Sequence, residues 1–182
     1  MATFHTLQPG SAANLSLPHL VLVGLPGSGK STVGAVLAER LDRGFLDFDV
    51  EITRREGMTV PEIFAQRGEA HFRGLERAIT EECRLLGGLV LAPGGGWMAQ
   101  PENIALVRPP ARLIYLKASP ETAAARLGAA IAGRPLLNRP DPRGELGRLL
   151  TARQAAYESS DLVVNVDRVD VQRVVEKIAQ LL

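Results

Sequence analysis

A chain of 182 residues with 46% hydrophobic and 23% charged residues has the composition of a single globular domain, which excludes a disordered or fibrous protein. Its 21 Lys and Arg against 20 Asp and Glu leave a formal net charge of +1, which argues against the broad basic face of a nucleic-acid-binding protein. The single cysteine, Cys83, excludes an internal disulfide framework, so we expect a reducing, cytoplasmic environment.

Residues 1–18 contain no Lys or Arg, so they lack the charged region of a secretory signal and the arginines of a transit peptide. We interpret them as a flexible extension that precedes one domain, residues 19–182. No apolar run approaches the roughly 18 residues that suggest a membrane span, and the sequence therefore indicates no membrane contact.

Short runs of Val, Ile and Leu alternate with segments of helical spacing along the domain. Strands that alternate with helices form parallel sheets with right-handed crossovers and helices on both faces. The apolar runs are continuous, which fits strands buried on both faces. We therefore predict an α/β fold of three layers, a doubly wound sandwich around a central five-stranded parallel sheet. The predicted strands are residues 20–23, 45–48, 89–92, 113–116 and 162–166, and the predicted helices are residues 31–41, 60–86, 120–130, 145–157 and 171–182.

The segment GLPGSGKST, residues 24–32, follows the first apolar run and precedes the first helical pattern. It matches the P-loop, G-x-x-x-x-G-K-[ST], in the context that this motif requires. Its glycines let backbone N–H groups point at phosphate oxygens, and the start of the next helix adds positive potential. Lys30 then reaches the outer phosphates, and the Ser31 hydroxyl is a ligand for Mg²⁺. The predicted nucleotide-binding residues are Gly27, Ser28, Gly29, Lys30, Ser31 and Thr32.

Asp47 and Asp49 lie two residues apart in FLDFDVEI, at the end of the predicted second strand. Residues i and i+2 of a strand project to the same face, so both carboxylates would face the crevice at the carboxyl ends of the strands. One would hold Mg²⁺ through water, and the other would orient or deprotonate a hydroxyl nucleophile. The alternative is a solvated strand end in which Asp49 caps a following helix.

Three consecutive glycines, Gly94, Gly95 and Gly96, directly follow the third predicted strand in APGGGWM. Such a run gives up side-chain packing and has an entropic cost. It is typical of a place where a ligand approaches the backbone closely, and an ordinary turn is the alternative.

The sequence leaves the roles of several other residues open. Glu69, Arg73 and Glu76 have the spacing of neighbours on one helix face, which by itself indicates a surface charge network. Trp97 is either a pocket wall or a core aromatic, and Cys83 is a packed or half-exposed thiol on a helix.

The segment from residue 128 to residue 144 interrupts the regular pattern with three prolines, three glycines and three arginines in 17 residues. Loops this long in a compact domain are usually functional or disordered, and we interpret this one as a mobile lid. Arg134 lies in it and Arg153 on the next predicted helix. Arginines from several segments suit an anionic substrate or a transferring phosphoryl group, although for each one alone a solvated surface role is the simpler interpretation.

In order and spacing, the segments GLPGSGKSTVG, FLDFD, VPEIFAQRGEAHFRGLE, PGGG, LIYLKASPE, GRPLL and RQAAYESSD resemble the shikimate kinase family over residues 20–166. The P-loop is shared by many kinases, whereas FR-x-x-E, GGG and RPLL in this order are far more specific. The resemblance implies the fold of nucleoside monophosphate kinases, with a lid and a substrate-binding helical region after the second strand. It also implies ATP-dependent phosphorylation of the 3-hydroxyl of shikimate, in chorismate and aromatic amino acid biosynthesis.

The resemblance also implies residue roles. Asp49 would bind the shikimate hydroxyls and act as the base, while Asp47 and Ser31 would serve one Mg²⁺ per subunit. Lys30 and Arg134 would stabilise the transferring phosphoryl group. The shikimate pocket would comprise Arg73 and Arg153 at the carboxylate, Glu76 beside Arg73, the backbone of Gly94, Gly95 and Gly96, and the walls Phe64 and Phe72. Further nucleotide contacts would come from Arg126, Arg134 and Arg168.

Two alternatives to a shikimate kinase stay open, and only the first belongs to another class of function. One is a sensory ligand domain of a transcription regulator, for which residues 1–18 are too short to form a DNA-binding domain. The other is a kinase of the same fold for gluconate or a nucleoside monophosphate. The family usually continues after GGG with a small residue and Val, whereas this chain has Trp97 and Met98. We expect a cytoplasmic monomer that binds ATP and shikimate and contacts neither nucleic acid nor membrane.

Overall fold

The computed structural model describes residues 17–182, so residues 1–16 of the predicted extension lie outside the described residues. The last two residues assigned to the extension are held by the domain. The carbonyl of Leu17 accepts a hydrogen bond from the Gly88 N–H at 2.9 Å, and the Pro18 carbonyl accepts one from Arg43 Nη1 at 2.8 Å. Leu17 and Pro18 are therefore both hydrogen-bonded to the domain.

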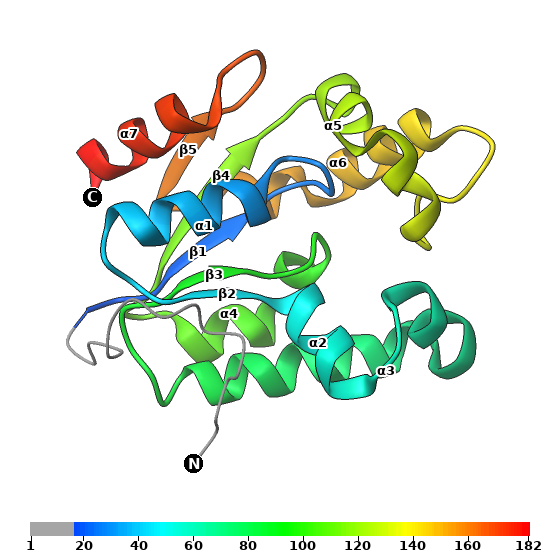
Figure 1. Ribbon diagram of the computed structural model, residues 1–182, viewed down its shortest axis with the longest axis horizontal. Helices are drawn as coiled ribbons and strands as arrows, with labels where there is room; N and C mark the ends of the chain where they lie inside the picture. The colour runs from blue at the N-terminus through cyan, green and yellow to red at the C-terminus, as the bar shows by residue number, and fades with distance from the viewer. Residues whose placement is uncertain (1–16) are drawn as a thin grey trace.

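Five parallel strands form one sheet in the order β2-β3-β1-β4-β5 (Figure 1), which confirms the predicted fold class. The first strand lies at the centre, with Leu20 opposite Val90 on one side and Arg112 on the other. Because the strand order reverses there, a crevice opens at the carboxyl ends of the central strands, where such sheets bind ligands. The strands are β1 (Leu20–Val23), β2 (Phe45–Asp47), β3 (Val90–Ala92), β4 (Arg112–Lys117) and β5 (Leu162–Asn165).

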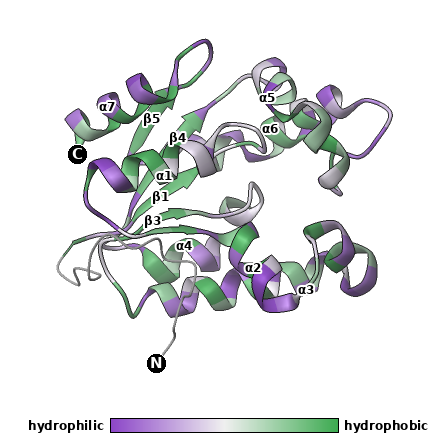
Figure 2. Cartoon of the chain, viewed as in Figure 1, coloured by the Kyte–Doolittle hydropathy of each residue, from purple (hydrophilic) through white to green (hydrophobic). Residues whose placement is uncertain are grey.

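Helices cover both faces of the sheet, and each face has its own hydrophobic core. On one face Leu37 and Val174 pack in a cluster with Leu22 of β1, and on the other Ile79 and Tyr157 pack in a cluster with β3. Figure 2 shows the strands as mainly hydrophobic and the surrounding helices as mixed. No helix within residues 17–182 is both long and apolar enough to cross a membrane. The first face carries α1 (Lys30–Arg40) and α7 (Val171–Leu181), and the second carries α3 (Val60–Cys83), α4 (Pro101–Val107) and α6 (Pro142–Glu158).

Two helices, α2 (Phe48–Glu56) and α4, are not predicted from the sequence. The first begins immediately after β2 without a loop, because the Asp47 side chain accepts a hydrogen bond from the Val50 N–H and caps it. It ends at Gly57, whose φ of 63° suits glycine. The fourth helix spans only two turns and starts at Pro101, too short for a periodic signal.

The third helix differs from its prediction in two ways. Gly68 has φ 80° and ψ 169°, which kinks α3 between its two halves. The helix ends at Cys83, which is fully buried, rather than at Leu86.

The segment 128–144 is more ordered than a long loop. After α5 (Pro120–Leu127), residues Gly128–Gly133 form a short 3-10 helix, η2. The last helix of the segment, α6, begins at Pro142, where the Asp141 side chain accepts a hydrogen bond from the Gly144 N–H at 2.9 Å. Irregular backbone is therefore confined to residues 134–141, and within it Leu137 is fully buried in the core.

Candidate active site

The P-loop joins β1 to α1 at the mouth of the crevice. Gly27 has φ 81°, and a Cβ there would lie 2.4 Å from the carbonyl oxygen of Ala123, so only glycine fits. Lys30, the first residue of α1, donates hydrogen bonds at 3.0 Å to the carbonyl oxygens of Gly24 and Leu25. The Lys30 ammonium therefore lies against the backbone carbonyls at the start of the loop.

Charges converge on the Lys30 ammonium. Burial lowers the pKa of Lys30 to about 8, and the nearby Arg134 acts in the same direction, while Asp49 and Asp47 oppose them. Phosphate oxygens beside Lys30 would favour its charged form, because opposite charges stabilise each other. The loop is thus electrostatically suited to a polyphosphate.

Ser31 and Asp47 place two oxygen ligands side by side at the start of α1 and the end of β2. The Ser31 hydroxyl donates a hydrogen bond of 2.5 Å to Asp47 Oδ2. Mg²⁺ prefers hard oxygen ligands and usually takes one or two from protein, with the rest from phosphates and water. This pair beside the P-loop lysine fits such an ion.

Asp49 does not lie on the second strand, so the predicted strand geometry is wrong. The strand ends at Asp47, which is also the helix cap that the sequence alternative assigned to Asp49. Asp49 sits in the first turn of α2 and its Oδ2 accepts a hydrogen bond from Arg134 Nη1 at 2.8 Å. Both carboxylates still face the crevice, one from a strand end and one from a helix.

Arg73 on α3 connects two glutamates. Its Nη1 donates to Glu76 Oε2 at 2.6 Å, and its Nη2 donates to Glu69 Oε1 at 2.7 Å. Glu76 is fully buried, so a purely superficial charge network is the wrong interpretation. Burial raises the pKa of Glu76, and the Arg73 guanidinium opposes this by stabilising the carboxylate. The glutamates thus fix the position of the arginine head group.

The three glycines after β3 are required because their surroundings leave no room for side chains. A Cβ on Gly94 would lie 2.5 Å from Glu76 Oε1, and one on Gly96 would lie 2.5 Å from Arg73 Nη2. A Cβ on Gly95 would lie 2.9 Å from Pro26 Cδ in the P-loop. This glycine loop, residues 94–96, therefore packs between the Arg73–Glu76 pair and the P-loop.

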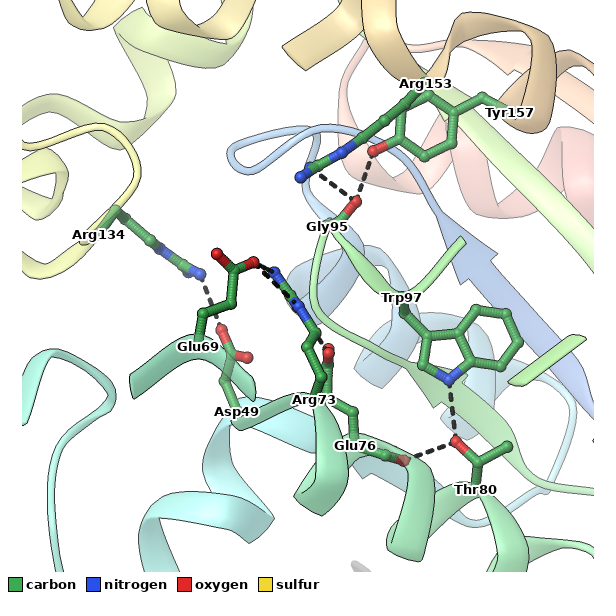
Figure 3. Close-up of polar contacts among 10 residues, drawn as sticks. All are labelled: Asp49, Glu69, Arg73, Glu76, Thr80, Gly95, Trp97, Arg134, Arg153 and Tyr157. Carbon is green, nitrogen blue, oxygen red and sulfur yellow. Dashed lines mark hydrogen bonds and ion pairs between the residues drawn. The ribbon is translucent and has the colours of Figure 1, made fainter. Parts of the chain in front are cut away.

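Arg153 reaches the same loop from α6. Its Nη1 donates to the Gly95 carbonyl at 3.0 Å, and the Tyr157 hydroxyl donates to the same oxygen at 2.7 Å (Figure 3). Tyr157 was missed from the sequence, although its spacing of four residues from Arg153 places the two on one helix face.

Trp97 is a core aromatic. Its side chain is almost fully buried, and its Nε1–H donates to Thr80 Oγ1 at 2.9 Å. The Thr80 hydroxyl in turn donates to the Glu76 carbonyl at 2.7 Å (Figure 3). Trp97 therefore packs behind the glycine loop, in the short helix η1 (Trp97–Ala99), and lines neither pocket of the crevice.

Two adjoining pockets fill the crevice and form one site, because both are lined by residues of the P-loop, of the glycine loop (residues 94–96) and of the segment 128–144. The rings of Phe64 and Phe72, 5.0 Å apart, form one wall of the first pocket. The first pocket is lined by Pro26, Asp49, Val60, Phe64, Phe72, Arg73, Gly94, Gly95, Gly96, Arg134, Pro135, Leu136, Leu137 and Arg153. The second is lined by Pro26, Gly27, Gly29, Lys30, Ser31, Thr32, Asp47, Asp49, Ala92, Pro93, Gly94, Gly95, Arg126, Leu127 and Arg134.

Of the other residues predicted to bind the nucleotide, Arg126 lies beside the P-loop and Arg168 lies outside both pockets. Arg126 Nη1 donates to the Ser28 carbonyl at 3.2 Å and its Nη2 donates to the Val166 carbonyl at 2.5 Å, so it flanks the P-loop. Ser28 itself is fully buried, its N–H donates to the Leu25 carbonyl at 3.1 Å, and it lines neither pocket. Arg168 is exposed on the turn after β5 and lines neither pocket, so it is not brought into the site.

Known proteins resemble this chain over most of its length. Residues 26–182 match the family model described as shikimate kinase. A shikimate kinase of Thioalkalivibrio sulfidiphilus is 40% identical over 163 residues, 89% of this chain and 85% of that protein. One of Bradyrhizobium diazoefficiens is 42% identical over 165 residues, 90% of this chain and 78% of that protein.

Solved structures show the same relationship. Shikimate kinase from Acinetobacter baumannii in complex with shikimate superposes with a TM-score of 0.87 at 37% identity, covering 92% of this chain and 93% of that one. A deoxyadenosine kinase from M. mycoides, at 16% identity and a TM-score of 0.61 over 90% of this chain and 98% of that one, shares the fold. With the family model matched over most of its length and relatives at 40% identity, the chain belongs to the shikimate kinase family.

Proposed function

We propose that this protein transfers the γ-phosphoryl group of ATP to the 3-hydroxyl of shikimate, as one step of chorismate and aromatic amino acid biosynthesis. The observation that carries the proposal is the pairing of two arginines, Arg73 and Arg153, in a pocket that adjoins the P-loop and has Asp49 on its lining. A kinase for an uncharged sugar has no need of two guanidinium groups there, whereas a carboxylate is bound well by them.

Shikimate would occupy the first pocket. Its carboxylate would lie between Arg73 and Arg153, and its ring would contact Phe64, Phe72 and the backbone of the glycine loop, which line that pocket. Glu76 would hold Arg73 in place from the buried side. The hydroxyl that reacts would then point towards the second pocket.

ATP would occupy the second pocket, with its phosphates on the backbone of residues 27–32 and on Lys30. Arg126 would flank the nucleotide, and Arg168 would reach it only through movement of its turn. Ser31 and Asp47 would hold Mg²⁺, which neutralises charge on the outer phosphates when bound.

The chemistry is an in-line displacement. The bond from the γ-phosphorus to its bridging oxygen breaks as the bond to the shikimate hydroxyl oxygen forms, ADP departs, and the hydroxyl proton passes to Asp49. Negative charge on the equatorial oxygens is stabilised by Lys30 and Arg134. The hydrogen bond from Arg134 to Asp49 would have to yield so that both groups reach the reactants.

Residues 128–144 would serve as the lid, opening to exchange ligands and closing to exclude water. Four residues of this segment, residues 134–137, line the first pocket, which supports this role. We further propose that the protein works in the cytoplasm as a monomer, with residues 19–182 as its catalytic domain.

A coupled assay of ADP release tests the function. Purified protein with ATP and Mg²⁺ is supplied in parallel with shikimate, quinate, gluconate and AMP. We expect turnover with shikimate to exceed that with each other acceptor by a factor of at least about 100. All four acceptors are anions, but the other three differ from shikimate in shape and in the placement of their hydroxyls, which leaves polar groups of the pocket unpaired. Equal or greater turnover with gluconate or AMP would contradict the proposal.

A further inference from the structure

One carbonyl oxygen of the glycine loop accepts two hydrogen bonds from the same helix. The Gly95 oxygen receives the Tyr157 hydroxyl at 2.7 Å and Arg153 Nη1 at 3.0 Å. Both lone pairs of the oxygen are therefore engaged. Gly95 also packs against Pro26, so the orientation of its peptide bears on both pockets.

The two donors differ in mobility. Tyr157 is fully buried, and its ring stacks on Tyr115 of β4 with centroids 5.0 Å apart and 22° between the planes. Arg153 is only partly buried and lines the first pocket. The tyrosine is thus packed against strand β4, while the guanidinium lies at the edge of the first pocket.

A carbonyl oxygen can only accept a hydrogen bond, so the Tyr157 hydroxyl is the donor. Burial raises the pKa of Tyr157, and the adjacent Arg153 guanidinium opposes this shift. With the carbonyl oriented in this way, Arg153 donates one N–H to the Gly95 carbonyl, and its remaining N–H groups can bind a ligand. Without the tyrosine hydroxyl, Arg153 would be the remaining side-chain hydrogen-bond donor to the Gly95 carbonyl. The carbonyl would then compete with a bound anion for the N–H groups of the guanidinium.

We propose that Tyr157 is a positioning residue: its hydroxyl orients the Gly95 carbonyl, and this carbonyl holds the Arg153 guanidinium where it binds the carboxylate of the substrate. The inference rests on the proposed function, because it concerns the affinity for shikimate. It concerns binding of the acceptor rather than of the nucleotide, since Tyr157 lines neither pocket itself.

The test compares Tyr157→Phe with Tyr115→Phe. Each change removes one hydroxyl from the same stacked pair, but the Tyr115 hydroxyl is buried without a hydrogen-bond partner among the described residues. Shikimate affinity is measured by titration calorimetry without nucleotide, and KM and kcat by ADP release. We expect Tyr157→Phe to raise the shikimate Kd and KM about three- to tenfold, the worth of one hydrogen bond. The ATP affinity and kcat should stay within about twofold, and Tyr115→Phe should leave all four values unchanged.

A second experiment, in an Arg153→Leu protein, distinguishes positioning of Arg153 by Tyr157 from a general loss of packing. In an Arg153→Leu protein, Tyr157→Phe should produce no further loss of shikimate affinity, because the tyrosine acts through the arginine. Retained ATP affinity shows that each variant is folded. An undiminished effect in the Arg153→Leu background, equal effects of the two tyrosine changes, or no change in shikimate Kd would each overturn the proposal. Failure of wild type to bind shikimate would instead refute the proposed function.

Discussion

Replacement of Gly96 by alanine should displace the Arg73 guanidinium in the acceptor pocket. The new Cβ would lie 2.5 Å from Arg73 Nη2, 2.6 Å from Cζ and 2.8 Å from Nη1. Ordinary contacts between such atoms are about 3.5 to 4.0 Å, so the guanidinium would have to move by roughly 1 Å. The obstacle is the charged end of a long side chain, which can move, so we expect the protein to fold.

This movement of Arg73 should lower both the free energy of unfolding and kcat/KM for shikimate, the second more strongly. Arg73 would lose the alignment of its 2.6 Å hydrogen bond to the buried Glu76, and a hydrogen bond to a charged group contributes about 1.5 to 3 kcal/mol. We expect the free energy of unfolding to fall by about that amount or less. Misplacement of a substrate-positioning group by about 1 Å can cost about 100-fold in rate, so kcat/KM for shikimate should fall about 10- to 100-fold.

Denaturant unfolding and ADP-release kinetics with varied shikimate or varied ATP measure these effects. Gly74→Ala is the matched control, since Gly74 lies on α3 next to Arg73 and a Cβ there meets nothing within 4 Å. That change should leave shikimate kinetics intact and stabilise the helix by up to about 1 kcal/mol. Normal shikimate kinetics in Gly96→Ala would refute the reasoning that the glycine is needed to place Arg73.

Three further predictions follow from single features of the structure. Lys30→Ala should abolish turnover, because the lysine faces the phosphates, while the thermal unfolding midpoint stays within a few degrees; ADP release and thermal unfolding measure the two. Burial lowers the pKa of His19 below 6.5, so the unfolded chain takes up its proton first as pH falls. Stability should therefore decline as pH drops below about 6.5 and level off below the folded-state pKa; urea unfolding from pH 7.5 to 5 should show a slope that His19→Gln reduces, and an unchanged slope would contradict this. Hydrogen exchange in residues 128–144 should slow when a non-hydrolysable ATP analogue and shikimate bind together, and equal protection with and without the ligands would count against a lid.

Local features of the site could be predicted from the sequence. The P-loop lies in one stretch of chain, and the strand before it and helix after it were both evident, so Lys30 and Ser31 were assigned by motif alone. The sheet followed from the same alternation of apolar runs and helical segments. The glycine loop was recognised as unusual, but its cause, contact with Arg73, Glu76 and Pro26, depends on three segments far apart in the chain.

Features that depend on tertiary contacts could not be predicted in this way. The spacing of Arg73 and Arg153 carries no information on their convergence, which came from family resemblance. Asp49 was placed on a strand because α2 starts without a turn residue, its cap being the last residue of β2. The burial of Glu76 and the hydrogen bond from Tyr157 to Gly95 arise only once α3 and α6 flank the glycine loop.

The central claim is that two arginines about 80 positions apart bind one carboxylate, and a double-mutant cycle of Arg73→Leu and Arg153→Leu on shikimate affinity tests it most directly. Each single change should weaken shikimate binding by about 2 to 5 kcal/mol, the range for loss of one partner of a buried charge pair, and leave ATP affinity nearly unchanged. The double variant should lose less than the sum, because both groups share one ligand. Small, independent effects at both positions would contradict the carboxylate pocket, and with it the assignment of shikimate as the acceptor.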